Sequence, residues 1–279
     1  MLSIQVERSL AAFCVLDADC QGVVAAKGAL GFLMTEVPLT GGHLAREVVR
    51  VDGAVHRRSS GDNAFSVRVL SHLQAVGYPY APRRLGVDEE GRDVLTFVPG
   101  ETTDHPSQRA LGAYAQGGKM LRALHDATAG HALAEGQECV IHGDPGPFNT
   151  IFQDGLPVAF IDWDSCRPGD PLDDLGYMAW TWCIQTQGHV PIADQARHLR
   201  ELRDGYADIQ SESLIRAIVR RQTELAEAEQ ANLRNRRHAP ERRRHAELAI
   251  SWAEADRELV VRHEKDLLAA LIDPQQPRD

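Results

Sequence analysis

The stretch of sequence that decides the fold is HGDPGPFN at residues 142–149, which is followed by IDWD at residues 161–164. The first motif carries Asp144 and Asn149 on one loop, and the second places Asp162 at the end of an apolar run. Carboxylate and amide oxygens are the hard ligands that Mg²⁺ prefers, and an aspartate can also accept the proton of a hydroxyl group. The pattern therefore indicates phosphoryl transfer, which needs positioning and charge stabilisation more than covalent catalysis.

The segment between the two motifs predicts how the chain brings them together. Two apolar runs, at residues 150–152 and 157–161, flank Asp154-Gly155, a dipeptide that is typical of tight β-hairpin turns. A hairpin reverses the chain, so we expect Asp162 to return to the loop that carries Asp144. The alternative is that each polar residue only caps a turn through nearby backbone groups, and the spacing of all three together disfavours it.

This pattern, H-x-D-x-x-x-x-N followed by an apolar residue and I-D, resembles the aminoglycoside phosphotransferase and choline kinase family, whose members are related to protein kinases. The stretch RPGDPLDDLGY at residues 167–177 is also similar to the segment after the metal-binding aspartate in that family. The resemblance covers residues 139–182 well and fades in the C-terminal helices. It implies an α+β, bilobal, protein-kinase-like fold with a small antiparallel-sheet N-lobe and a larger helical C-lobe.

The resemblance also implies a role for each residue of the motif. Asp144 takes the position of the catalytic base, and Asn149 and Asp162 take the positions of magnesium ligands. His142 and Asp174 take positions that support the catalytic loop. For Asp174 a second interpretation is equally simple, because an aspartate before Leu175 could be the N-cap of the next helix.

The first half of the chain is rich in predicted strands. Residues 35–58 contain short apolar runs that are broken by Asp52-Gly53 and by an earlier glycine turn, and they predict three antiparallel strands. A helix is expected from residue 65 to residue 76, and a strand from residue 93 to residue 98. We therefore expect an N-terminal extension of uncertain role at residues 1–34, a nucleotide-binding N-lobe at residues 35–98, and a C-lobe at residues 99–279.

The N-lobe departs from the kinase pattern at the cation that meets the phosphates. Kinases place a lysine on the third strand, but lysine occurs in this chain only at positions 27, 119 and 265. Strand alternation puts Val55 and Arg57 on one face, so we expect Arg57 to contact the phosphates. Residues 63–74 contain no carboxylate, so the usual Lys-Glu ion pair cannot form. Other expected nucleotide contacts are the turn Thr40, Gly41 and Gly42 over the phosphates and the hinge Thr96, Phe97 and Val98 beside the adenine.

The resemblance implies a phosphotransferase that depends on ATP and Mg²⁺ and acts on a hydroxyl of a small molecule, such as an aminoglycoside-like antibiotic, a sugar or an amino alcohol. GTP is compatible as the donor. One alternative is a kinase-like regulator that binds nucleotide with little or no turnover, which the missing lysine and glutamate favour. The other is a metallohydrolase that uses His142 and Asp144 as metal ligands, but the further ligand pairs that it needs are absent from the sequence.

Composition restricts the partners and the location. The net charge of −10 argues against a nucleic-acid partner, and no segment reaches the roughly 20 apolar residues of a membrane span. The five cysteines are scattered and form no metal or disulfide motif, which is typical of a reducing compartment. We therefore expect a cytoplasmic protein with a small-molecule partner, and the sequence leaves the oligomeric state open.

Overall fold

The computed structural model of the chain describes residues 24–27, 33–39, 48–58, 64–234 and 239–271. Its larger sheet is antiparallel throughout, with the strand order β1-β2-β3-β4-β6-β5. The strands are β1 (Val24–Lys27), β2 (Leu33–Pro38), β3 (Val48–Val51), β4 (Ala54–Arg57), β5 (Arg84–Val87) and β6 (Asp93–Thr96).

Turn chemistry explains the hairpin between β3 and β4. Asp52 and Gly53 both have positive φ, 46° and 82°, as the tight turn that matches the right-handed twist of two strands requires. The three antiparallel strands expected between residues 35 and 58 are confirmed. The sheet also extends further toward the N-terminus than residue 35, because Val24 of β1 pairs with Glu36 of β2. An upstream run without alternation thus still forms a strand, because a neighbouring strand supplies its hydrogen bonds. The division into domains at residue 34 stays a prediction.

Strand β5 was not expected from the sequence. Its four residues include Gly86, and its two apolar side chains, Leu85 and Val87, are exposed, so the strand has no buried apolar face. Pairing with β6 supplies its hydrogen bonds, with a register shift between Arg84 and Gly86. This edge strand is thus stabilised by hydrogen bonds to the neighbouring strand and not by burial of an apolar face.

Helix α1 (Ala64–Ala75) follows the sheet and has the expected periodicity. Val69, Leu70 and Leu73 are buried in the core. The helix ends at Ala75 and is followed by Gly77, which has a φ of 76°, and the Tyr78 N–H donates to the Leu73 carbonyl at 2.9 Å. This is the geometry by which a left-handed glycine closes a helix.

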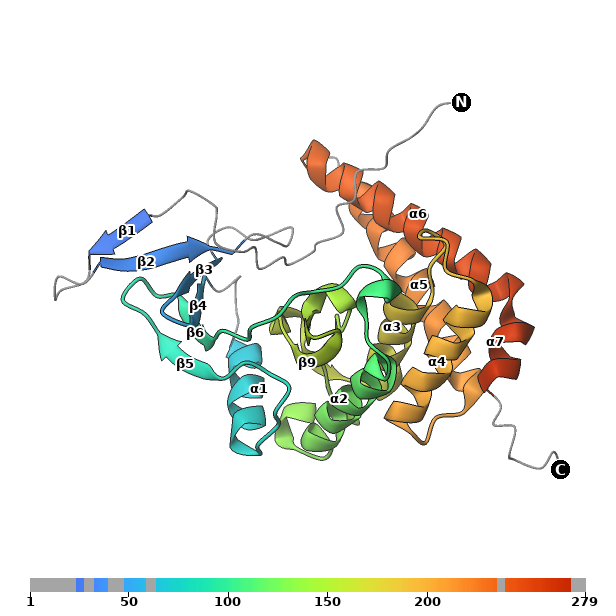
Figure 1. Cartoon of the computed structure of the whole chain (residues 1–279), viewed down its shortest axis with the longest axis horizontal. Coiled ribbons are helices and arrows are strands. Elements are labelled where there is room, and N and C mark those ends of the chain that lie inside the picture. The colour runs from blue at the N-terminus through green and yellow to red at the C-terminus, as the bar shows by residue number, and fades with distance from the viewer. Residues whose placement is uncertain (1–23, 28–32, 40–47, 59–63, 235–238, 272–279) are drawn as a thin grey trace.

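The second lobe is mainly helical. In Figure 1 its helices lie at the opposite end of the molecule from β1 to β6, with the short strands of this lobe between the two groups. The helices are α2 (Ala113–Thr128), α3 (Pro171–Cys183), α4 (Ile192–Tyr206), α5 (Ser211–Arg234), α6 (Pro240–Arg262) and α7 (Glu264–Leu271). The short strands are β7 (Cys139–Ile141), which pairs with β10 (Arg167–Gly169), and β8 (Thr150–Gln153), which pairs with β9 (Leu156–Phe160). The bilobal α+β fold and the hairpin around Asp154-Gly155 are confirmed.

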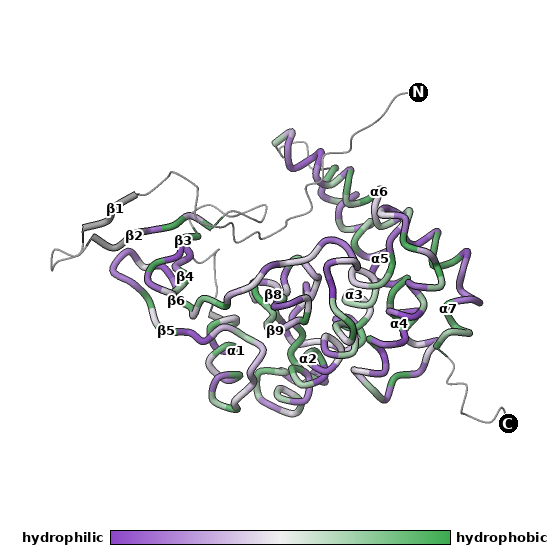
Figure 2. Tube along the Cα trace, in the orientation of Figure 1, coloured by the Kyte–Doolittle hydropathy of each residue, from purple (hydrophilic) through white to green (hydrophobic). Residues whose placement is uncertain are grey.

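The core of this lobe lies around α3. Figure 2 shows hydrophobic positions alternating with hydrophilic ones along its helices, and the apolar side chains of α3 are almost all buried. The fully buried Trp180 stacks on Trp252 of α6 at 4.3 Å, and its indole N–H donates to Asp256 at 2.9 Å. Among the described residues, no helix is long and apolar enough to cross a membrane.

Candidate active site

The site is built on the loop that joins β7 to β8. After Ile141 the chain turns through Gly143, whose φ is 86°, and a Cβ at this position would lie 2.4 Å from the carbonyl oxygen of Ser165. Glycine is therefore required here both by the backbone conformation and by the close approach of the second motif. A short 3₁₀ turn, η3 (Pro147–Asn149), leads from the loop into β8.

Asn149 holds Asp144 in place. The amide nitrogen of Asn149 donates to Oδ2 of Asp144 at 2.8 Å and to the Asp144 carbonyl oxygen at 3.1 Å. The other carboxylate oxygen of Asp144, Oδ1, is buried and has no hydrogen-bond partner within the described part of the chain. A buried acceptor without a partner costs free energy, so its presence requires an explanation, and a donor supplied by a bound molecule would satisfy it.

The surroundings of Asp144 keep its pKa above the usual range. Burial is the largest cause, because it destabilises the charged carboxylate, and the nearby Asp162 adds repulsion. The Tyr177 hydroxyl, the His142 ring and the Asn149 amide act in the opposite direction but do not cancel this effect. Asp144 thus combines a fixed position with raised basicity.

Tyr177 is a residue of the site that sequence reasoning missed. It lies on α3, and burial and the neighbouring Asp144 raise the pKa of its hydroxyl well above the ordinary value. One signal could have found it. Tyr177 follows Asp174 by three positions, so once α3 is expected the two side chains share a helix face.

The β8–β9 hairpin brings Asp162 to the same loop, as expected. The Ile161 N–H donates to the Asn149 carbonyl at 2.9 Å, which joins the end of the hairpin to its beginning. Asp162 has a φ of 59°, a conformation that aspartate adopts more readily than most residues. The pKa of its carboxyl is raised, first by loss of solvent and then by repulsion from Asp164, while Arg57 lowers it.

Asp174 and His142 tie the loop to the rest of the lobe. The two carboxylate oxygens of Asp174 accept the main-chain N–H groups of His142 at 2.6 Å and of Gly143 at 2.8 Å. The His142 Nε2 lies 3.0 Å from the Ile161 carbonyl, so the ring bridges the two motifs. The N-cap of α3 is Asp170, whose side chain accepts the Leu172 N–H at 2.8 Å. The geometry therefore decides between the two interpretations of Asp174: it contacts the loop and is not the cap.

The hydrogen bonds of Asp174 have a larger effect on its pKa than its burial. Burial alone would raise the pKa of this carboxyl, but the His125 ring, at 3.2 Å, and the Gly143 N–H hold it below the usual range. His125 in turn contacts the Tyr206 hydroxyl of α4 at 2.7 Å. The ionised carboxylate is thus the centre of a buried network that links α2, α3 and α4 to the loop.

On β4 the alternation is as expected. Arg57 points toward the second motif, where its Nη2 donates to Asp164 at 2.6 Å and its Nη1 lies 3.5 Å from Asp162. His56 faces the other way and lies 2.8 Å from Asp88. The structure brings Arg57 to the motif residues, and its contact with phosphates stays a prediction.

The other predicted nucleotide contacts differ in outcome. The Phe97 N–H donates to the Gly53 carbonyl at 3.1 Å, so this amide would have to exchange partners to meet a base edge. The Thr96 N–H is likewise bonded to the Arg83 carbonyl at 2.9 Å, and Val98 follows directly on the chain. Thr40, Gly41 and Gly42 lie outside the described residues.

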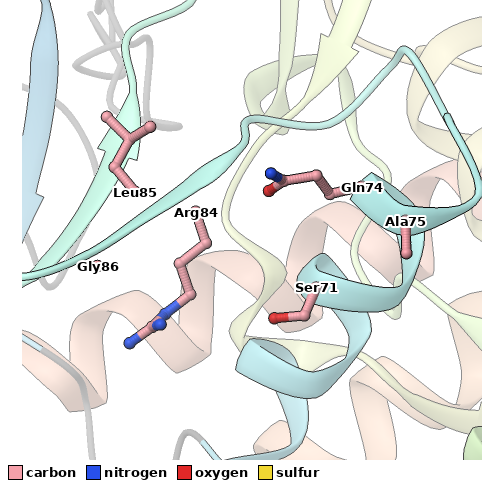
Figure 3. A pocket seen from close by; sticks show the side chains of 6 residues that line it. All are labelled: Ser71, Gln74, Ala75, Arg84, Leu85 and Gly86. Atoms are coloured by element: carbon pink, nitrogen blue, oxygen red, sulfur yellow. The ribbon is translucent and has the colours of Figure 1, made fainter.

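A separate pocket of about 310 Å³ lies between α1 and β5. Figure 3 shows Ser71 and Gln74 of the helix opposite Arg84 of the strand. Arg84 is paired with Asp93 at 3.2 Å. The pocket contains none of the residues around Asp144. The candidate active site is therefore assigned from the functional groups around Asp144 and not from the position of this pocket.

Comparison with known proteins identifies the family. The sequence profile of the phosphotransferase enzyme family matches residues 127–210, which include both motifs. The trifolitoxin immunity protein of Rhizobium leguminosarum bv. trifolii is 34% identical in an alignment of 194 residues that covers 61% of this chain and 74% of that protein.

Solved structures share the fold at low sequence identity. A choline/ethanolamine kinase family protein from Mesorhizobium loti is 16% identical, with a TM-score of 0.57 over 90% of this chain and 92% of that one. APH(2″)-IIa, in its complex with gentamicin, is 11% identical, with a TM-score of 0.52 over 76% of this chain and 89% of that one. The motifs, the profile match and the 34% identical relative together place this chain in the phosphotransferase enzyme family.

Proposed function

We propose that this chain transfers the γ-phosphoryl group of ATP, bound with Mg²⁺, to a hydroxyl group of a small molecule. The observation that carries the proposal is the buried Asp144, which Asn149 holds through one carboxylate oxygen while the other has no partner in the described structure. The Asp144 carboxylate lies beside Asp162 and the Tyr177 hydroxyl, on a loop whose backbone is fixed by Asp174.

In this proposal Asp144 is the base. Its Oδ1 accepts the hydrogen bond of the acceptor hydroxyl and orients the oxygen toward the γ-phosphorus. As the new phosphorus–oxygen bond forms and the bond to ADP breaks, the hydroxyl proton passes to the carboxylate. The raised pKa of Asp144 suits this role, because a more basic carboxylate accepts a proton more readily.

Asn149 and Asp162 would hold the magnesium ion. The described residues include no group of three or more His, Cys, Asp or Glu side chains that could bind a metal by themselves. An amide oxygen and a single carboxylate fit a site whose remaining ligands are phosphate oxygens and water, which is the usual environment of Mg²⁺. When bound, the ion neutralises charge on the β- and γ-phosphates.

In this proposal the two lobes bind different parts of the reacting system. Residues 35–98, together with β1, would bind the nucleotide through Arg57 and the segment Thr96, Phe97 and Val98. Residues 99–279 would supply the catalytic loop, the metal ligands and the helices that hold the acceptor. A cytoplasmic location is also part of the proposal, since ATP is available there and the described cysteines, Cys139, Cys166 and Cys183, are free thiols.

A coupled assay of ADP release tests the proposal. The panel of acceptors contains aminoglycosides, sugars and amino alcohols, and also trifolitoxin, because a relative of this chain is an immunity protein against it. At least one acceptor should release ADP in proportion to phosphorylated product, and EDTA or Asp144→Asn should abolish the release. A wild-type protein that binds no nucleotide in the presence of Mg²⁺ would contradict the proposal.

A second candidate function is a kinase-like regulator that binds nucleotide with little turnover. The replacement of the usual lysine by Arg57 and the absence of a carboxylate from the sequence of α1 favour it. The two functions are separated by Asp144→Asn. If the protein is a regulator, Asp144→Asn should keep both the affinity for nucleotide and the effect of the protein in the cell. If it is an enzyme, the variant should keep the affinity for nucleotide and lose that effect.

A further inference from the structure

A cation that contacts phosphates needs a counter-charge that directs it when no nucleotide is bound. In this chain the helix beside the sheet cannot supply one, because α1 has the sequence AFSVRVLSHLQA and contains neither Asp nor Glu. Helix α1 packs instead against the 3₁₀ turn η4 (Trp163–Ser165), which comes directly after Asp162. Helix α1 thus packs against a turn that carries another acidic residue, Asp164.

The contacts of Arg57 single out Asp164 as its partner. The Nη2 of Arg57 donates to Oδ1 of Asp164 at 2.6 Å, while its Nη1 is 3.5 Å from Oδ1 of Asp162. The first distance is that of a strong charge-assisted hydrogen bond, and the second is that of a weaker ion pair. The Arg57 side chain is only 15% exposed, so it is not a solvated surface group. Its contacts with the two aspartates hold the guanidinium in place.

Asp164 stands on a rigid support. Trp163, the preceding residue, is 1% exposed, and its indole N–H donates to the Phe160 carbonyl at 3.0 Å. The Cys166 N–H closes the turn on the Trp163 carbonyl at 3.2 Å. The backbone of Asp164 is thus anchored in the core while its carboxylate faces β4, the geometry that a positioning group needs.

We propose that Asp164 is the positioning residue for Arg57 and supplies, from the metal-binding motif, the carboxylate that α1 lacks. The inference rests on the proposed function. Because the stronger bond of Arg57 is to Asp164, Asp162 can turn to a magnesium ion without releasing Arg57. The guanidinium has five N–H donors, so it can keep one bond to Asp164 and direct others at phosphate oxygens.

A rival role for Asp164 is that of an additional magnesium ligand. The two roles differ in what they depend on. A positioning residue acts through Arg57, so its effect should disappear when Arg57 is absent and should be independent of the metal. A metal ligand acts through Mg²⁺, so its effect should persist without Arg57 and disappear in EDTA.

The experiment is a double-mutant cycle read by nucleotide affinity. The dissociation constant of ATP is measured by calorimetry with Mg²⁺ and in EDTA for wild type, Asp164→Asn, Arg57→Ala and the double variant. We expect Asp164→Asn to weaken ATP binding roughly tenfold in both conditions, the scale of one charge-assisted hydrogen bond. In the Arg57→Ala background the same substitution should change the affinity by less than about twofold.

The matched control is Asp126→Asn, which neutralises the aspartate of another Arg–Asp pair, Arg122–Asp126 at 2.8 Å, on the exposed side of α2. It should leave the affinity unchanged. Thermal melting checks that each variant is folded, and Asp164→Ser replaces Asp164→Asn if the latter melts early.

Three results would overturn the inference. ATP binding that is unchanged or tighter in Asp164→Asn would show that Arg57 needs no such partner. A loss confined to Mg²⁺ conditions, and undiminished in the Arg57→Ala background, would assign Asp164 to the metal. A wild-type protein without affinity for ATP would contradict the proposed function itself, and the inference with it, whereas the first two results leave the proposed function intact.

Discussion

The Asp174 carboxylate accepts the main-chain N–H of His142 at 2.6 Å, so helix α3 is tied directly to the loop that carries Asp144. The same carboxylate accepts the Gly143 N–H and is 0% exposed on its side chain. The loop that carries Asp144 is therefore fixed by one buried carboxylate, whose removal would leave two main-chain donors unpaired.

The first prediction concerns this support. Asp174→Ala should lower the free energy of unfolding by roughly 3–5 kcal/mol, the usual cost of breaking a buried ionic network from one side. The neighbouring Asp173→Ala is the matched control. Asp173 pairs with the exposed Arg220 of α5 at 2.7 Å, and its removal should cost no more than about 1 kcal/mol. Urea unfolding measures both, and equal losses would show that the buried network carries no special stability.

The second prediction concerns Asp144 and pH. Because the pKa of Asp144 is raised above the value of 3.8 for a free side chain, the ionised carboxylate destabilises the fold above that pH, and this penalty disappears as the pH falls through the folded pKa. Asp144→Asn cannot ionise, so we expect it to be more stable than wild type at pH 7, by on the order of 1 kcal/mol.

The measurement is unfolding free energy as a function of pH. The advantage of Asp144→Asn should shrink as the pH falls through the raised pKa of the folded Asp144 carboxyl toward 3.8, because the wild-type group then loses its charge as well. Glu89→Gln, which removes a charge from an exposed turn, should show no such trend. A variant that is less stable than wild type at pH 7 would mean that the Asn149 hydrogen bond outweighs the cost of burial.

The third prediction separates the proposed base from the proposed metal ligands. Asp144→Asn should reduce turnover by roughly 10²–10⁴-fold while magnesium-dependent ATP binding persists, because general-base catalysis is lost and the ligands remain. Asp162→Asn should weaken ATP binding in Mg²⁺ but not in EDTA, since it removes a charged oxygen from a hard cation. Asn149→Ala should lie between the two. An Asp144→Asn variant without ATP affinity, alongside a normal Asp162→Asn, would interchange the assigned roles.

The fourth prediction concerns the face of β4. Arg57→Ala should weaken ATP binding roughly tenfold or more, the scale of a charged hydrogen bond, because it removes the cation directed at the metal-binding motif. Arg58→Ala, on the exposed opposite face, should change the affinity by less than about twofold. Calorimetric titration with ATP compares the two. A larger loss in Arg58→Ala would show that the phosphates lie on the other side of the strand.

The β8–β9 hairpin could be predicted from the sequence because its signals are local. Asp154-Gly155 specifies a tight turn by its own backbone preferences, and the apolar runs on its two sides then pair as antiparallel strands. The positions of Asp144, Asn149 and Asp162 follow from that pairing, because each is set by its distance along the chain from the turn. Helix α1 was readable for the same reason, since its periodicity and the glycine that ends it are local.

Only the tertiary structure decided which charges meet. Arg57 and Asp164 lie 107 positions apart, and no local preference indicates that a strand cation is directed by a turn from the other lobe. The same holds for the buried Tyr177 beside Asp144, whose pKa is raised by surroundings that assemble only on folding, and for β5, which pairs with β6 although its apolar side chains are exposed. Backbone turns and periodicities act within a few residues of sequence, whereas electrostatic partners and edge-strand pairing are determined by proximity in space.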